Sequence, residues 1–460
     1  MSTYHSKKAK EFLKDPKKVE RHDRTFWSLR QKRDAAAAEL PEWEDLHEHA
    51  SRIKEHTATH LADYLEQFSN SLERNGVIVH FAKDAQEFNE MVYGILESHK
   101  VKKLVKSKSM LTEECEMNPY LIKRGINVVE SDLGERILQL MHLKPAHIVM
   151  PAIHLTRDEI GEMFEEKGIS KEKGNHDPAY LTRCAREDLR GDFMDADAGL
   201  TGCNFGVAAT GDCVVCTNEG NADMSTSVPK LHIVAMGIEK VIPDYDSLAV
   251  FQRLLARSGT GQPSTAFTSQ IRKARPGGEM HVILVDNGRS DMIANKEHWM
   301  TLKCIRCGAC MNTCPVYRRS GGYSYSYFIP GPIGVDLGML KNPKQHSGNV
   351  SACSLCLSCD CVCPAKVTPG SQIYRWRQSL EKYGTENKEK KVMAEGMKVV
   401  YENYHIYDAL LRNSSVANHI PESLMDIKLN PWSIGHTMPK FAKKPFHVIF
   451  KHAMEELKHE

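Results

Sequence analysis

The 460-residue chain has almost no net charge, no long hydrophobic run and no apolar segment near its start. Its 61 basic and 59 acidic side chains give a formal charge of +2, which excludes a strongly basic nucleic-acid-binding protein on bulk charge. The longest apolar stretches, such as residues 233–236, are far shorter than the ~20 residues of a membrane span. Residues 1–18 are rich in charged side chains, so we expect no secretory leader. These absences predict a cytoplasmic protein without a membrane span.

Cysteine is the residue type that stands out. The chain has 14 cysteines, and nine of them lie between Cys304 and Cys363. A disulfide framework would be expected to spread over a short secreted chain instead. The clustering therefore predicts concentrated metal or redox chemistry in a reducing compartment.

Sequence periodicity divides the chain into four predicted regions. Residues 1–70 show helical periodicity and form an N-terminal extension. Residues 71–295 alternate β-rich runs with helix-like stretches, which predicts an α/β domain with a largely parallel or mixed sheet. Residues 296–370 hold the cysteine cluster, and residues 371–460 predict a helical C-terminal extension. The β-rich runs are 77–81, 104–105, 128–129, 148–150, 214–215, 233–236 and 282–285. The helix-like stretches between them include 85–98, 135–140, 157–166 and 247–257.

Eight of the clustered cysteines form two copies of the bacterial ferredoxin motif, C-x2-C-x2-C-x3-C-P. In this motif three closely spaced thiolates bind one cluster and the fourth binds the other. We therefore predict two [4Fe–4S] clusters. The first would be held by Cys304, Cys307, Cys310 and Cys363, and the second by Cys353, Cys356, Cys359 and Cys314. Zinc is the alternative, but structural zinc usually pairs two separated C-x2-C units.

Several other cysteine and histidine residues have either a structural or a metal-binding interpretation. Cys361 is surplus to the second motif and is expected to be a packed thiol near a cluster. We expect Cys203, Cys213 and Cys216 to be packed hydrophobes, because residues 213–216 favour a strand on which a C-x2-C pair points to opposite faces. A third metal or redox site is the alternative for these three. His56 and His60 lie four apart on a predicted helix, where a solvated face is the simpler interpretation than a metal site.

Residues around the motifs also have two interpretations. Arg306, Arg318 and Arg319 could raise a cluster potential or be solvated, and Tyr323, Tyr325 and Tyr327 could cover a cluster or pack within their loop. The run from Gly259 to Gly261 is similar to the start of a dinucleotide fingerprint. It lacks the third glycine and follows a predicted helix, so we expect no nucleotide or flavin site.

Seven segments of the predicted α/β domain resemble the LUD domain of lactate-utilisation proteins. They are residues 106–114, 130–135, 147–154, 204–206, 209–211, 217–221 and 232–240. The segment that holds the two motifs, residues 296–370, resembles the helical ferredoxin module found in iron–sulfur subunits of succinate dehydrogenases and glycolate oxidases. The order of a LUD domain, this α-helical ferredoxin domain and a helical extension is similar to that of the lactate-utilisation protein B family. The resemblance implies a fold related to CoA transferases and sugar-phosphate isomerases, with a ligand cleft at the strand ends.

The resemblance also implies a function. It is that of an iron–sulfur electron-transfer subunit in a system oxidising L-lactate to pyruvate, with a cysteine-rich iron–sulfur protein and a small LUD-only protein as partners. Alternatively, the LUD domain itself acts on a hydroxy acid or acyl substrate, or the clusters serve a non-redox scaffold. Glu219 is the candidate catalytic carboxylate, and Ser107, Lys108, Ser109 and Asn221 are candidate substrate contacts. In the structural alternative Glu219 and Asn221 build a turn, and Lys106 and Lys108 are exposed.

Overall fold

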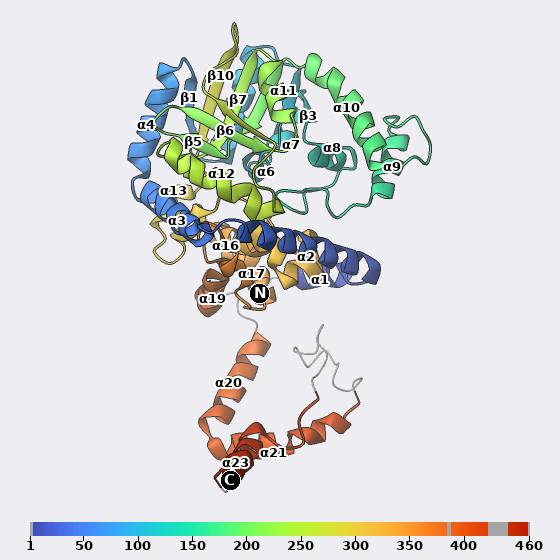
Figure 1. The fold of residues 1–460 in the computed structure, drawn as a ribbon, viewed down its shortest axis with the longest axis vertical. Coiled ribbons are helices and arrows are strands. Elements are labelled where there is room, and N and C mark those ends of the chain that lie inside the picture. Colours follow the sequence, from blue (N-terminus) through green and yellow to red (C-terminus); the bar gives the residue numbers. More distant parts are fainter. Residues whose placement is uncertain (1–2, 384–387, 422–439, 459–460) are drawn as a thin grey trace. The chain divides into compact units, whose positions relative to one another are not determined.

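The fold comprises two compact units, Ser2–Ser379 and Leu380–Glu460. A computed structural model describes residues 3–383, 388–421 and 440–458 (Figure 1). The first unit contains the N-terminal helices, the sheet and the cysteine-rich segment together. Both sets of candidate site residues therefore lie in one compact body.

The second unit is helical in its described parts. Its elements are η4 (Leu380–Tyr383), α20 (Lys388–Glu402), α21 (Tyr404–Asn413), η5 (Ser414–His419) and α23 (Phe446–Glu456). Helix α21 begins where the Asn403 side chain accepts hydrogen bonds from the amides of His405 and Ile406. None of the candidate site residues lies in this unit.

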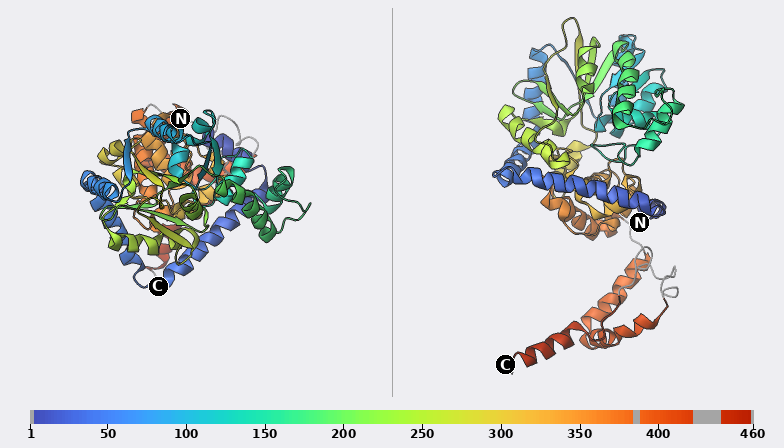
Figure 2. Two further views of the ribbon diagram at one scale, coloured as in Figure 1. Left: turned by 90° about the horizontal axis from the view of Figure 1, so that it is seen from above. Right: turned by 45° about the vertical axis from the view of Figure 1, so that its right-hand side comes forward.

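Four helices precede the sheet: α1 (Tyr4–Phe12), α2 (Pro16–Ala38), α3 (Trp43–Thr59) and α4 (Leu61–Arg74). The long helix α2 begins at Asp15, whose side chain accepts the Lys18 amide. It packs against α12 (Tyr245–Thr260), α14 (Ala309–Thr313) and α15 (Pro315–Ser320). As Figures 1 and 2 show, α2 crosses the junction between the sheet-containing part and the cysteine-rich helices. It thereby ties the two parts together.

The main sheet has six strands, all parallel, in the order β1-β10-β7-β4-β2-β3. The strands are β1 (Ile78–Ala82), β2 (Lys103–Lys106), β3 (Asn127–Glu130), β4 (Ala198–Gly202), β7 (Leu231–Gly237) and β10 (Glu279–Val285). Alternate residues of β7 contribute to two different cores: Ile233 faces α5–α7 and Val234 faces α4. Burial on both faces explains why these strands appear as continuous apolar runs.

Helices α5 (Ala85–Ser98), α6 (Met110–Glu114) and α7 (Met117–Ile122) cover one face of the main sheet. Helix α4 and a second sheet cover part of the other face. The second sheet has the order β8-β5-β6-β9. Its strands are β5 (Phe205–Val207), β6 (Asp212–Thr217), β8 (Val241–Ile242) and β9 (Phe267–Ile271). A parallel α/β architecture is therefore present, as the alternating sequence pattern predicts.

The remaining elements connect the strands and form the cysteine-rich segment. They are α8 (Leu133–Leu140), α9 (Arg157–Glu166), α10 (Pro178–Met194), α11 (Asn221–Ser227), η1 (Ile238–Lys240), α13 (Arg289–Ala294), η2 (Trp299–Lys303), η3 (Gly322–Ser324), α16 (Gly331–Lys341), α17 (Pro343–Ala352), α18 (Ser358–Cys361) and α19 (Pro369–Ser379). A search of the described residues finds no helix with both the length and the apolar character to cross a membrane.

The strand predicted at 148–150 is wrong. These residues lie in a turn-rich segment between α8 and α9. The amides of Val149 and Met150 both donate to Nδ1 of His147, at 3.1 Å. A side chain therefore satisfies the donors that a strand would offer to a neighbouring strand.

Candidate iron–sulfur and ligand-binding sites

Four cysteines from the two motifs line one small pocket. Cys304, Cys307 and Cys310 belong to the first copy, and Cys363 is the last cysteine of the second. The other lining residues are mostly apolar: Ile148, Ile305, Gly308, Ala309, Ile333, Pro364, Ala365, Val367 and Pro369. An apolar wall with four thiols fits a [4Fe–4S] cluster, because the cluster needs thiolate ligands and limited access of water.

The thiols influence one another in two groups. Burial raises the pKa of Cys307, and the neighbouring Cys363 and Cys304 thiols raise it further. Burial likewise raises the pKa of Cys314 to about 12, with contributions from Cys353 and Cys356. In each group, thiols of one copy therefore lie close to the last cysteine of the other copy.

The two motif loops have left-handed residues at the same two positions. Arg306 and Leu355, each two residues after the first cysteine, have φ of 62° and 57°. Gly308 and Leu357, each four residues after it, have φ of 82° and 58°. The left-handed residues turn backbone amides toward the sulfur atoms: those of Arg306 and Leu355 lie 3.4 and 3.3 Å from the Sγ of the first cysteine. Such N–H···S bonds favour the charged thiolate.

The last cysteine of each copy is also hydrogen-bonded. The Tyr317 amide donates to Sγ of Cys314 at 3.4 Å, and the Val367 amide donates to Sγ of Cys363 at 3.3 Å. By contrast, Cys361 is exposed, so it is not the packed thiol that the sequence analysis expected. The neighbouring Cys363 and Pro364 line the cysteine pocket instead.

The aromatic and basic residues near the motifs have separate roles. Tyr325 is buried beside Cys314, whereas the partly exposed Tyr323 hydroxyl donates to the Lys144 carbonyl at 2.6 Å. Arg318 pairs with Asp23 of α2 at 2.7 Å, so it is not a simple solvated side chain. The second tyrosine of the loop therefore covers a motif cysteine, and Arg318 ties the motif to α2.

Helix α12 ends against the loop of the first motif. A Cβ atom on Gly259 would lie 2.5 Å from the carbonyl oxygen of Cys307. The carbonyl of Gly259 also accepts a hydrogen bond from Nδ2 of Asn312, at 2.7 Å. The glycine run that is similar to a dinucleotide fingerprint is thus a close packing point between α12 and the cysteine loop.

We expect Gly259→Ala to weaken cluster retention, because the added methyl group would displace the Cys307 backbone at a cost of about 1–3 kcal/mol. Iron release to a chelator should be faster than in the wild type. Gly191→Ala on α10, where a Cβ has no neighbour within 4 Å, is the matched control. Equal release rates for the two variants would contradict this packing role.

A second, larger cavity of about 550 Å³ lies at the carboxyl ends of the parallel strands. Segments that follow β2, β3, β4 and β7 contribute to its lining, which is the usual position of a ligand cleft in an open parallel sheet. The cavity brings together all five candidate ligand residues: Ser107, Lys108, Ser109, Glu219 and Asn221. It is also lined by Cys307, so the cleft and the cysteine pocket share a wall.

Lys108 and Glu219 make specific contacts at the cleft. Lys108 donates to the Val149 carbonyl at 2.8 Å and lies 3.8 Å from the Asp132 carboxylate. Glu219 accepts the amide of Leu133 at 3.2 Å, at the start of α8. Burial raises the pKa of Glu219, and the adjacent Asp132 raises it further. Glu219 therefore takes up a proton more readily than an exposed carboxyl group does.

Asn221 has a structural contact as well as a place in the cleft. Its Oδ1 accepts a hydrogen bond from the Thr217 hydroxyl at 3.2 Å, at the beginning of α11. Asn221 therefore both builds the turn and lines the cavity.

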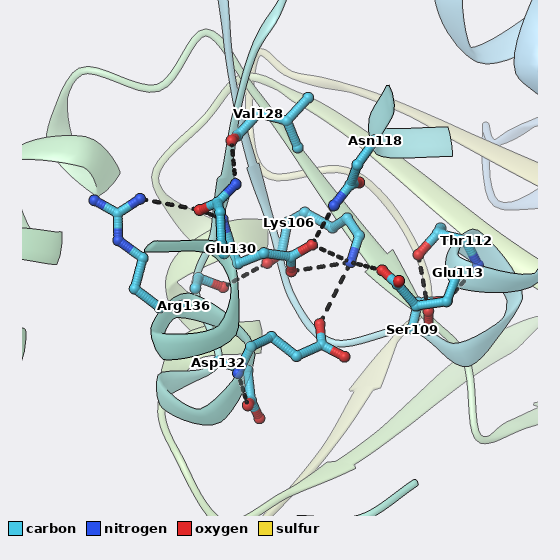
Figure 3. A network of polar contacts seen from close by, with 12 residues as sticks. Lys106, Ser109, Thr112, Glu113, Asn118, Val128, Glu130, Asp132 and Arg136 are labelled. Atoms are coloured by element: carbon cyan, nitrogen blue, oxygen red, sulfur yellow. Dashed lines mark hydrogen bonds and ion pairs between the residues drawn. The ribbon is translucent and has the colours of Figure 1, made fainter. Parts of the chain in front are cut away.

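An ion network that the sequence patterns did not predict lies at the ends of β2 and β3, next to the segments that line the cleft (Figure 3). Lys106, the last residue of β2, is fully buried, so the alternative of an exposed side chain is wrong. Its ammonium lies 2.7 Å from Glu130, 3.5 Å from Glu135 and 3.6 Å from Glu113. The three carboxylates are close enough together to hold a metal ion, but the Lys106 ammonium already supplies their cation.

This network positions the residues of the cleft. Register pairing places Lys106 beside Glu130 on adjacent parallel strands. The carbonyl of Lys106 accepts the amide and the hydroxyl of Ser131, both at 2.9 Å. The segments that follow β2 and β3 are thereby fixed against each other where they enter the cleft.

The other sequence candidates remain apart from the cysteine pocket. Cys213 is fully buried on β6, while Cys203 and Cys216 line the large cavity. Burial raises the pKa of Cys216 to about 12, which keeps it a thiol. His56 contacts the Tyr64 hydroxyl at 3.0 Å and His60 contacts the His56 carbonyl at 3.0 Å. Neither histidine joins a cluster of three potential ligands within the described part of the chain.

A parallel α/β domain with a strand-end cleft, joined to a paired-cysteine segment, defines an iron–sulfur protein with a LUD domain. Residues 65–291 match the model described as the LUD domain, and residues 300–367 match the 4Fe-4S dicluster domain. The chain is 37% identical over 448 residues to "Lactate utilization protein B" of Shouchella clausii (strain KSM-K16), covering 94% of this chain and 93% of that protein.

Two further relatives are similar to this chain over about three quarters of its length. "Lactate utilization protein B" of Bacillus pumilus (strain SAFR-032) is 43% identical over 77% of this chain and 76% of its own length. The "Uncharacterized electron transport protein YkgF" of Escherichia coli (strain K12) is 41% identical over 75% of this chain and 74% of its own length. The chain belongs to the lactate utilization protein B family and is an iron–sulfur protein of lactate utilisation.

Proposed function

We propose that the chain is the electron-transfer subunit of a multi-protein system that oxidises L-lactate to pyruvate, and that it carries two [4Fe–4S] clusters. The observation that carries this proposal is the position of Cys363 in the same pocket as Cys304, Cys307 and Cys310. An exchange of the fourth ligand is typical of two-cluster ferredoxin modules and requires both clusters to lie close together. Each cluster supplies a site that accepts and releases one electron at a time.

The surroundings of the two motifs suggest a direction for the electrons. Cys307 of the first motif borders the cleft, whereas Cys356 of the second motif is exposed. The adjacent Leu357 is 43% exposed. The first motif therefore serves the inner, ligand-facing end and the second serves the surface, where a redox partner docks. The proposed partners are a cysteine-rich iron–sulfur protein and a small LUD-only protein.

Anaerobic co-purification with metal analysis tests this proposal. We expect about eight irons and about eight labile sulfides per chain, since each cluster contains four of each. Both clusters should be reversibly reducible, as followed by electron spin resonance. Stoichiometric zinc with negligible iron would contradict the proposal, and clusters that cannot be reduced would favour a scaffold role.

Cys307 lines both the cleft and the cysteine pocket, and this position favours a second candidate function. In this alternative the LUD domain itself binds and acts on a hydroxy acid, with Glu219 as the candidate proton-transfer group beside the first motif. The discriminating assay is turnover of L-lactate by the purified chain with an artificial electron acceptor. Activity of the chain alone would favour the second candidate, and strict dependence on partner proteins would favour the first.

A further inference from the structure

The inner end of the cleft holds an excess of basic groups near the first cysteine motif. Lys240 follows β7, and Arg306 lies between the first two cysteines of the motif; both line the cavity. A third basic residue, Arg289, is neutralised, because it pairs with Glu114 at 2.9 Å and with Glu239 at 2.5 Å. The charges of Lys240 and Arg306 are less fully compensated.

Lys240 and Arg306 retain hydrogen-bond donors that the protein does not use. Within the described residues, the Lys240 ammonium forms no hydrogen bond or ion pair. Arg306 approaches Glu239 only at 4.0 Å through Nη2, and its buried Nη1 has no hydrogen-bond partner. The buried hydroxyl of Ser107, on the β2 side of the same cavity, is also without a partner. Buried donors without partners are costly, so their presence in a cavity points to a ligand that supplies acceptors.

The remaining charges in the cavity restrict the ligand. On the β2–β3 side, the carboxyl groups of Glu219 and Asp132 face the single cation of Lys108, so this side disfavours a phosphate ester or another polyanion. A small monoanion can place its single charge at the basic end and its neutral part toward the polar groups. The volume of about 550 Å³ is ample for a molecule of this size.

We propose that Lys240 and Arg306 bind the carboxylate of a small 2-hydroxy or 2-oxo acid at the end of the cleft that borders Cys307. This inference rests on the second candidate function and names the residues that recognise the acid. It places the acid next to the first motif, while Lys108 and Glu219 face it from the rest of the cavity.

A titration of the anaerobically prepared, full-length holoprotein with L-lactate and with pyruvate, followed by calorimetry, tests the proposal. Lys240→Met should weaken binding of the tighter acid about tenfold or more, since the ion-paired hydrogen bond is lost. Lys240→Arg, which keeps the charge, should retain more of the affinity. Inorganic phosphate should bind far more weakly than either acid.

Lys303→Met is the matched control. Lys303 is buried, donates to the Ser51 hydroxyl at 2.7 Å and lies near Cys363, but it does not line the cleft. If the basic groups only balance the charge of a cluster, both variants should shift the cluster potential and neither should change acid binding. That outcome, or the absence of acid binding at millimolar concentration in a fully loaded wild type, would overturn the proposal.

Iron and sulfide content, measured on the same samples, separates this inference from the proposed function. Full, reducible clusters without acid binding would contradict only the carboxylate site. Absence of the clusters would contradict the electron-transfer function itself. Arg306→Gln provides a second variant, in which weaker acid binding at unchanged iron content supports the site.

Discussion

Cys363→Ala is expected to remove about four of about eight irons, as does Cys307→Ala, although the two cysteines belong to different motifs. The physical reason is that both thiols line the same pocket. Combining the two substitutions should remove no more iron than either alone. Iron analysis and electron spin resonance of the reduced proteins measure the remaining cluster.

A complementary pair of substitutions, at Cys314 and Cys356, tests the second proposed cluster. Cys314→Ala should remove the same cluster as Cys356→Ala, and joining Cys307→Ala with Cys314→Ala should remove both. Cys361→Ala is a close control, because this thiol lies in the second motif but is exposed; its iron content should equal that of the wild type. Additive iron loss from Cys307→Ala and Cys363→Ala would mean that each motif binds its own cluster.

Lys106→Met is expected to lower the free energy of unfolding by about 3–5 kcal/mol, because it leaves buried carboxylates without a cation. Burial alone would lower the pKa of Lys106, but Glu130, Glu135 and Glu113 raise it, so the side chain is charged in the native protein. Urea-induced unfolding of the full chain, followed by circular dichroism, measures the effect.

Lys103→Met is the matched control on the same strand. Lys103 pairs with Asp192 at 3.0 Å, and the two side chains are 24% and 20% exposed. Water screens such a pair, so its loss should cost at most about 1 kcal/mol. A cost for Lys106→Met no larger than that for Lys103→Met would show that the buried network does not stabilise the sheet.

Features encoded by local sequence could be predicted well. The helices predicted at 85–98 and 157–166 have the same bounds as α5 and α9, because helical periodicity and capping residues are local signals. The predicted runs at 104–105, 128–129, 233–236 and 282–285 lie in strands of the main sheet. The cysteine spacing also predicts that Cys363 shares a cluster with the first motif. Cys363 lines one pocket with Cys304, Cys307 and Cys310, and binding of a cluster by these four thiols stays a prediction.

Features that depend on distant residues could not be predicted in the same way. Two of the three partners of Lys106, Glu130 and Glu135, lie 24 and 29 residues away in the chain, and their contact with Lys106 exists only once β2 and β3 pair. The sequence signal for this network was the position of Lys106 and Glu130 directly after the apolar runs 104–105 and 128–129. In the same way, Lys240 and Arg306 are 66 positions apart in the sequence and line one cavity only in the folded chain.

The sharing of one pocket by Cys304 and Cys363 has a consequence for biosynthesis. Cys363 is the last of the eight motif cysteines to be translated, so the proposed first cluster cannot be completed on a nascent chain that ends before it. The main sheet, whose last strand ends at Val285, can already close at that stage. With the proposed ligand exchange, the LUD sheet can fold before the first cluster is delivered, and we expect iron-starved cells to accumulate a chain with a formed sheet and an empty cysteine segment.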